Sequence, residues 1–108
     1  MVNPRQFEVF LISLDPTVGA ETKKTRPCVI VSPDEMNQHI QTVIVAPLTS
    51  KGTRYPTRVA VTFRGTKGQV VLDQIRTVDK SRLIKKLGAV SGTTGMAICN
   101  TLVEMFSR

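Results

Sequence analysis

Two polar segments, residues 17–26 and 49–58, gather side chains that can bind a phosphate. Five of their basic residues are Lys23, Lys24, Lys51, Arg54 and Arg58. The same segments hold Glu21, Arg26 and Thr49, which offer a carboxylate, a guanidinium and a hydroxyl. If the fold joins the segments, the cations form a track for a polyanion backbone that passes these three groups. Each cation taken singly is also typical of an ordinary solvated surface charge.

The overall charge agrees with such a partner. Fifteen Lys and Arg residues against eight Asp and Glu residues give a net charge of +7 on 108 residues. This excess favours a polyanionic partner. Nucleases, repressors and ribosomal proteins share it, as do some merely soluble cationic proteins, so the charge indicates a class of partner and no activity.

The sequence offers no pattern for metal or thiol chemistry. Cys28 lies in the apolar run 28–31 and Cys99 on an expected helix, and no Cys-x-x-Cys or Cys/His cluster accompanies either. We expect buried free thiols. With one histidine and no clustered carboxylates, the chain is expected to need no metal and no other cofactor.

Short β-strand patterns fill most of the chain. Residues 7–14, 27–31, 42–48, 58–63 and 69–73 are rich in β-branched or alternating apolar residues. The glycines of 64–68 predict a hairpin loop, and 74–78 extends the strand 69–73 beyond a bend. Residues 83–88 fit a strand or a helix, and Gly88 favours the strand. Residues 17–25 have no periodicity and are expected to form a long exposed loop.

Two helices have capping signals. Ser32 is the expected N-cap of a short helix that begins at Pro33 and ends near His39, with Glu35 placed for a capping box. Asp79 can cap a single turn through residue 82. Ser91 caps a last helix, where Ile98, Leu102 and Met105 or Phe106 form an apolar stripe that we expect to cover the sheet.

These elements predict one domain, residues 1–108, of the α+β class and mostly β. The expected architecture is a twisted, partly closed antiparallel barrel with short helices and a C-terminal helix. No run is long enough for a membrane span, and the N-terminus lacks the apolar core of a signal peptide. A cytoplasmic location is therefore expected.

Several motifs resemble the MazF/PemK family of type II toxins. They are LDPTVGAE at 14–21 with TRP at 25–27, VIVS at 29–32 with Asn37, APLTS at 46–50, and DQIRTVDK at 73–80 with Arg82 and Leu83. The resemblance covers residues 7–106. It departs at residues 5–8, where RQFE replaces the usual Arg-Gly-Asp or Arg-Gly-Glu, which leaves the start of the first strand uncertain.

The resemblance implies a homodimeric barrel that acts as a sequence-specific endoribonuclease toxin. Such a protein cuts single-stranded mRNA, leaves a 2′,3′-cyclic phosphate and a 5′-hydroxyl, and so inhibits translation. It also implies a cognate antitoxin, acidic and partly disordered, which holds the toxin inactive. DNA would be contacted only through the antitoxin complex.

Three residues are then expected to be catalytic. Arg26 matches the family's Arg-Pro pair; because an arginine side chain stays protonated, its expected role is a bidentate clamp on the phosphorane that can also donate to the leaving oxygen. The Thr49 hydroxyl can donate to a non-bridging oxygen. Glu21 can accept the 2′-OH proton. The alternative roles are an ordinary strand-edge cation for Arg26, a turn threonine for Thr49 and a solvated surface charge for Glu21. The identity of the general base and of the general acid stays open.

The remaining expected site residues bind RNA. Gln74 offers an amide able to read a base edge, and Tyr55 is the one exposed candidate for stacking, because the four phenylalanines fit core positions. The backbone contacts are expected from Lys23, Lys24, Ser50, Lys51, Arg54, Arg58 and Arg76. His39 lies outside every motif and is not expected to be catalytic.

Two other functions remain open. One is a non-catalytic toxin of the same fold that resembles CcdB and poisons DNA gyrase, although the C-terminal residues 105–108 lack the Trp-Gly-Ile ending of that family. The other is a basic nucleic-acid-binding repressor module. Products from bare RNA would distinguish the endoribonuclease from both.

Overall fold

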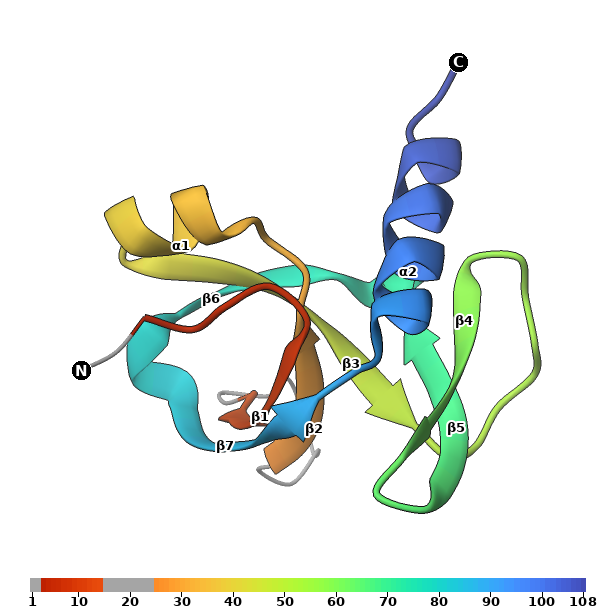
Figure 1. Ribbon diagram of the computed structural model, residues 1–108, viewed down its shortest axis with the longest axis horizontal. Coiled ribbons are helices and arrows are strands. Elements are labelled where there is room, and N and C mark those ends of the chain that lie inside the picture. Colours follow the sequence, from red (N-terminus) through yellow and green to blue (C-terminus); the bar gives the residue numbers. More distant parts are fainter. Residues whose placement is uncertain (1–2, 15–24) are drawn as a thin grey trace, which may run out of the picture.

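The chain forms a curled antiparallel sheet with one long helix packed on it (Figure 1). The computed structural model describes residues 3–14 and 25–108. Its strands are β1 (Glu8–Ser13), β2 (Thr25–Ile30), β3 (Thr42–Thr49), β4 (Arg58–Phe63), β5 (Thr66–Val71), β6 (Arg76–Asp79) and β7 (Leu83–Ala89). The helices are α1 (Asp34–His39) and α2 (Gly92–Met105), with 3-10 turns η1 (Leu72–Gln74) and η2 (Lys80–Arg82). The predicted fold class is confirmed.

The strand order is β4-β5-β3-β2-β1-β7, and β6 pairs with β3 beside this path. All the pairings are antiparallel. β3 is the central strand because it pairs with β2, β5 and β6 along different parts of its length. The end of β3 is therefore held from two sides, by β2 and by β5.

The sheet buries apolar side chains on both faces. One cluster includes Val29, Leu72 and Ile98, and the other includes Cys28, Ile30 and Val45. Neighbouring residues of β2 alternate between the two clusters, which explains why residues 28–31 form a continuous apolar run rather than an alternating one. α2 contacts β4 and η1 and covers the first cluster (Figure 1).

The structure confirms two predicted caps. The Asp79 carboxylate accepts a hydrogen bond from Ser81 N, which holds the pKa of Asp79 below its usual value. Ser91 Oγ accepts from Thr94 N at 3.2 Å and begins α2. The ambiguous residues 83–88 form a strand, as favoured, and β1 begins at Glu8 after a turn closed by the Glu8 N to Arg5 O hydrogen bond.

The predicted cap at Ser32 is wrong. α1 begins after Pro33 without a side-chain cap. Ser32 is buried and its hydroxyl is used elsewhere: it accepts from Ile44 N at 3.0 Å and donates to Asn37 Oδ1 at 2.6 Å. A buried hydroxyl that joins a strand to a helix satisfies the backbone of β3 instead of the exposed helix end.

Two boundaries also differ from the prediction. The hairpin turn is only Arg64 and Gly65, both with positive φ, and β5 already begins at Thr66. The bend after β5 is η1, so Gln74 lies in a 3-10 turn and not in a strand. The predicted apolar stripe of α2 is confirmed, and of its two possible ends Met105 packs on the core whereas Phe106 is 69% exposed.

The expected loop 17–25 lies largely outside the described residues, and its last residue, Thr25, begins β2. None of the helices in residues 3–14 and 25–108 is long and apolar enough to cross a membrane.

Candidate nucleic-acid interface

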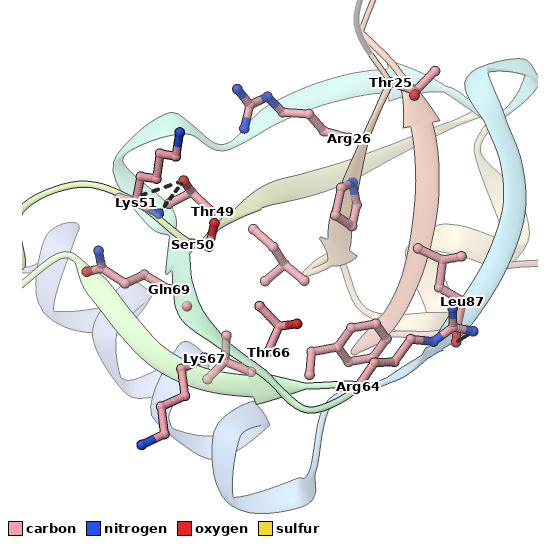
Figure 2. A pocket seen from close by; sticks show the side chains of 15 residues that line it. Thr25, Arg26, Thr49, Ser50, Lys51, Arg64, Thr66, Lys67, Gln69 and Leu87 are labelled. Carbon is pink, nitrogen blue, oxygen red and sulfur yellow. Dashed lines mark hydrogen bonds between the residues drawn. The ribbon is translucent and has the colours of Figure 1, made fainter.

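A pocket of about 600 Å³ opens where β2, β3, β5 and β7 come together (Figure 2). Four basic residues line it: Arg26, Lys51, Arg64 and Lys67. None of the described residues that line it is acidic. The other lining residues are Thr25, Pro27, Leu48, Thr49, Ser50, Val61, Phe63, Thr66, Gly68, Gln69 and Leu87. The lining therefore favours an anionic ligand with an apolar part.

The sheet register brings Arg26 and Thr49 together. Cys28 of β2 lies opposite Pro47 of β3. Arg26 and Thr49 each lie two residues beyond this pair on their strands, so alternation places them on the same face, and both line the pocket. Figure 2 shows both side chains on one side of the pocket, close to Lys51. Two of the three predicted catalytic residues thus share one site.

Thr49 ends β3 in a hydrogen-bonded turn. Its hydroxyl accepts from Lys51 N and donates to Lys51 O, both at 3.2 Å. This is the ordinary use of a turn threonine, which was the alternative to a catalytic role. A hydroxyl on a half-exposed residue can rotate, so the same oxygen can donate to a ligand while still accepting from Lys51 N.

The neighbouring strand β5 supports this turn at close range. Gly68 packs so tightly against β3 that a Cβ atom on it would lie 2.4 Å from Thr49 O. Gln69 lies opposite Thr49 in the ladder and is only 8% exposed. Its Nε2 donates to Gly52 O at 3.3 Å, and its Oε1 has no hydrogen-bond partner among the described residues. β5 therefore fixes the position of the Thr49 turn.

We expect Gly68→Ala to be destabilising because the added methyl group meets backbone atoms that cannot rotate away. The free energy of unfolding should fall by about 1–3 kcal/mol, the usual cost of overpacking. Urea denaturation would measure it. Gly92→Ala is the matched control, since a Cβ there meets nothing within 4 Å. Equal stability of the two variants would contradict the close packing at Gly68.

Arg58 is engaged within the protein. Its Nε and Nη2 donate to the two carboxylate oxygens of Asp73 at 3.2 and 3.3 Å, and its Nη1 donates to Thr53 O. The hydrogen bonds from Arg58 hold the pKa of Asp73 below its usual value. The guanidinium also lies 4.8 Å from the ring centroid of Tyr55. In this state Arg58 anchors the loop that follows Thr49.

Arg76 shares an environment with Arg26 although it does not line the pocket. Burial raises the pKa of the Cys28 thiol to about 12, and Arg26 and Arg76 both act to lower it. Cys28 Sγ also donates to Arg26 O. Both guanidinium charges therefore act on the same buried thiol, and the predicted free cysteine there is inert.

The other predicted residues form three groups: some line the pocket, some lie apart from it, and some lie outside the described residues. Ser50 and Lys51 line the pocket, whereas Arg54, Tyr55 and Gln74 are exposed and do not. His39 lies on α1 with its ring bonded to Glu35 O, away from the pocket lining. Glu21, Lys23 and Lys24 lie outside the described residues.

Sequence reasoning missed the contribution of β5. Thr66, Lys67 and Gln69 line the pocket, as does Arg64 of the turn. The sequence predicts a loop over residues 64–68, which hides Arg64, Thr66 and Lys67, and it places Gln69 in a strand without indicating a site there. The available signal was the Arg64-Gly65 pair, since a two-residue turn would have extended the strand back to Thr66.

Metal ligands are not grouped in the described residues. Across 3–14 and 25–108, no three His, Cys, Asp or Glu side chains are placed so that they could hold one ion.

Comparison with known proteins points to a single group. The family described as "PemK-like, MazF-like toxin of type II toxin-antitoxin system" matches residues 5–106. Endoribonuclease MazF of Staphylococcus epidermidis is 36% identical over 104 residues, which cover 91% of this chain and 87% of that protein.

Solved structures agree with this result. A mycobacterial endoribonuclease in complex with its cognate antitoxin has a TM-score of 0.79 at 29% identity, covering 94% of this chain and 92% of that one. MazF from Deinococcus radiodurans has a TM-score of 0.81 at 23% identity, with 97% of each chain covered, and supports the fold.

Proposed function

Because the chain belongs to the PemK-like and MazF-like family of type II toxins, we propose that it is an endoribonuclease that cuts single-stranded RNA at a specific short sequence. The observation that carries this proposal is that Arg26 and Thr49 both line one basic pocket, whose described lining residues include no acidic side chain. A phosphodiester bound there meets a guanidinium and a hydroxyl from two adjacent strands.

The proposed reaction uses the neighbouring hydroxyl of the RNA itself. The 2′-oxygen attacks phosphorus, the bond from phosphorus to the 5′-oxygen breaks, and a 2′,3′-cyclic phosphate and a 5′-hydroxyl result. One proton leaves the 2′-OH and one reaches the 5′-oxygen. The protein must therefore supply a base, an acid and groups that stabilise the crowded, negatively charged phosphorane.

Arg26 is proposed to bind two phosphorane oxygens and to donate toward the leaving 5′-oxygen. Its planar guanidinium fits this geometry. Thr49 donates to a non-bridging oxygen. Glu21 is proposed as the acceptor of the 2′-OH proton on the family resemblance alone. No step requires a metal ion, because each role falls to an organic group of this chain.

The remaining predicted residues bind the RNA on either side of the reacting phosphate. Ser50 and Lys51 are adjacent to Thr49 and line the pocket, and the charges of Arg76 and Arg26 both act on Cys28. Arg54 and Tyr55 extend the surface along the exposed loop. Gln74 is proposed to read a base, and Arg58 to act through the loop that it anchors.

We also propose a homodimer, inhibition by an antitoxin, and action in the cytoplasm, where mRNA is translated. α2 exposes Met96, Val103 and Phe106 to between 65% and 69%, an apolar surface suited to a second copy. An acidic, partly disordered antitoxin segment would compete with RNA for the basic pocket. The related mycobacterial endoribonuclease is found with its cognate antitoxin.

The direct test is purified protein with a mixed-sequence RNA in excess chelator. We expect discrete fragments whose new 5′ ends carry a hydroxyl and whose 3′ ends carry a cyclic phosphate. Mapping the ends would also give the recognition sequence. Loss of activity in chelator would contradict the proposed metal independence but not the endoribonuclease activity itself. Binding without fragments would favour a repressor module, and inhibition of gyrase without fragments would favour a CcdB-like toxin.

A further inference from the structure

Polar residues from three strands form a row on one face of the sheet. Arg26 of β2 and Thr49 of β3 line the same pocket, and Thr49 lies opposite Gln69 of β5. Lys67 is two residues before Gln69, so alternation along β5 places it on the same face. The row crosses about 10 Å of sheet from β2 to β5, two strand spacings.

Lys67 is the last residue of this row, and its ammonium group is available to bind a ligand. It is exposed, and its ammonium takes part in none of the ion pairs found in the described residues. Its nearest basic neighbour along the hairpin, Arg64, is different: Arg64 Nη2 donates to Leu87 O at 2.5 Å and its guanidinium lies 5.8 Å from the Phe63 ring centroid. Figure 2 shows Lys67 and Gln69 leaving β5 on the side of Lys51, whereas Arg64 reaches across to Leu87.

The interior beside this row is largely apolar. Pro27, Leu48, Val61, Phe63 and Leu87 line it, and Thr66 adds a hydroxyl. A nucleobase has apolar faces and a polar edge, and a cavity of about 600 Å³ can hold one. The cations on the rim match the phosphate of a nucleotide, and the apolar walls inside match the faces of its base.

We propose that the RNA crosses the β4–β5 hairpin, with Lys67 bound to a phosphate that flanks the scissile one and the intervening base in the pocket. This inference rests on the proposed function and extends it, because it assigns the direction of the RNA path and a binding subsite on β5. Gly68 permits this path, since the absence of a side chain lets β5 lie directly against Thr49.

The test compares Lys67→Ala with Arg108→Ala in binding a non-cleavable oligonucleotide with 2′-deoxyribose at the cut. Each variant removes one exposed cation, and residue 108 lies beyond α2, far from the hairpin in Figure 1. Lys67→Ala should weaken binding roughly two- to fivefold, the scale of one exposed ion pair. The slope of log affinity against log salt should also become shallower by about 0.7, one phosphate contact on a single strand. Arg108→Ala should change neither.

A second measurement addresses the base. Oligonucleotides with a single abasic site, placed at each position in turn, should lose affinity most strongly at one position next to the cut. In Lys67→Ala cleavage assays the loss should fall mainly on KM. An unchanged salt slope in Lys67→Ala, or abasic sites that all have the same small effect, would overturn the proposed path.

These outcomes separate the inference from the proposed function. If the wild-type protein cuts RNA but Lys67→Ala behaves like Arg108→Ala, the path is wrong and the endoribonuclease stands. If binding depends on Lys67 while the wild type produces no fragments, the subsite stands and the proposed reaction fails.

Discussion

An RNA with a single 2′-deoxy nucleotide on the 5′ side of the cut is expected to resist cleavage completely at that position. The substitution removes the attacking oxygen and leaves every other contact in place. Since no other nucleophile is part of the proposed reaction, the rate should fall below detection, while affinity for the protein stays nearly unchanged.

Single-turnover cleavage and a binding titration on the same oligonucleotide would measure both quantities. The control is the same RNA with the 2′-deoxy nucleotide moved one position to the 3′ side, which should be cut at close to the normal rate. Normal cleavage of the first substrate would rule out 2′-OH attack and require a different nucleophile, such as water.

Arg26→Ala is expected to lower kcat on the order of a hundredfold or more, the scale for removing one preorganised donor to a developing charge. Among the described residues that line the pocket, the other guanidinium belongs to Arg64, which donates to Leu87 O. Arg26→Lys should restore little, because an ammonium cannot form two parallel hydrogen bonds to the phosphorane.

Single-turnover rates at saturating RNA would separate this effect from weaker binding. Circular dichroism and urea denaturation are needed beside them, because Arg26 lies in β2 and its carbonyl accepts from Cys28. A fold that is intact with a rate reduced less than tenfold would contradict the phosphorane clamp. Full rescue by lysine would show that charge alone is required.

Much of the fold could be predicted because it depends on local patterns. Apolar alternation located β4 and the turn residues located η2 and α2, whose caps at Asp79 and Ser91 form as expected. Each of these signals depends on a few adjacent residues, so it can be recognised without knowing how the rest of the chain folds.

The errors occurred where tertiary contacts override local preference. Ser32 has the sequence of a helix cap, but its hydroxyl is buried and binds Ile44 N. Arg58 stays a predicted RNA contact, but its charge alone did not indicate the bidentate partner that the structure gives it, Asp73, fifteen residues away. Neither partner can be recognised from neighbouring sequence.

In the candidate site, too, local motifs could be recognised from the sequence, whereas tertiary contacts could not. Arg26 and Thr49 could be named from motifs, but their proximity depends on the register between β2 and β3. The first half of β5 could not be predicted once the turn had been assigned too many residues. Lys67 then fell outside any expected strand, and the face it shares with Gln69 and Thr49 could not be recognised.

The pairing of β1 with β7 determines when the protein becomes active during its synthesis. Glu8 lies opposite Ala89, so the sheet closes over nearly the whole length of the chain. Such non-local pairing is slow, typically milliseconds to seconds. Until β7 emerges from the ribosome, β1 remains an open edge that can pair with other chains, and the pocket lacks the wall that contains Leu87. We therefore expect a nascent chain to expose the edge of β1 and to lack the complete pocket until β7 pairs with β1 in a late step.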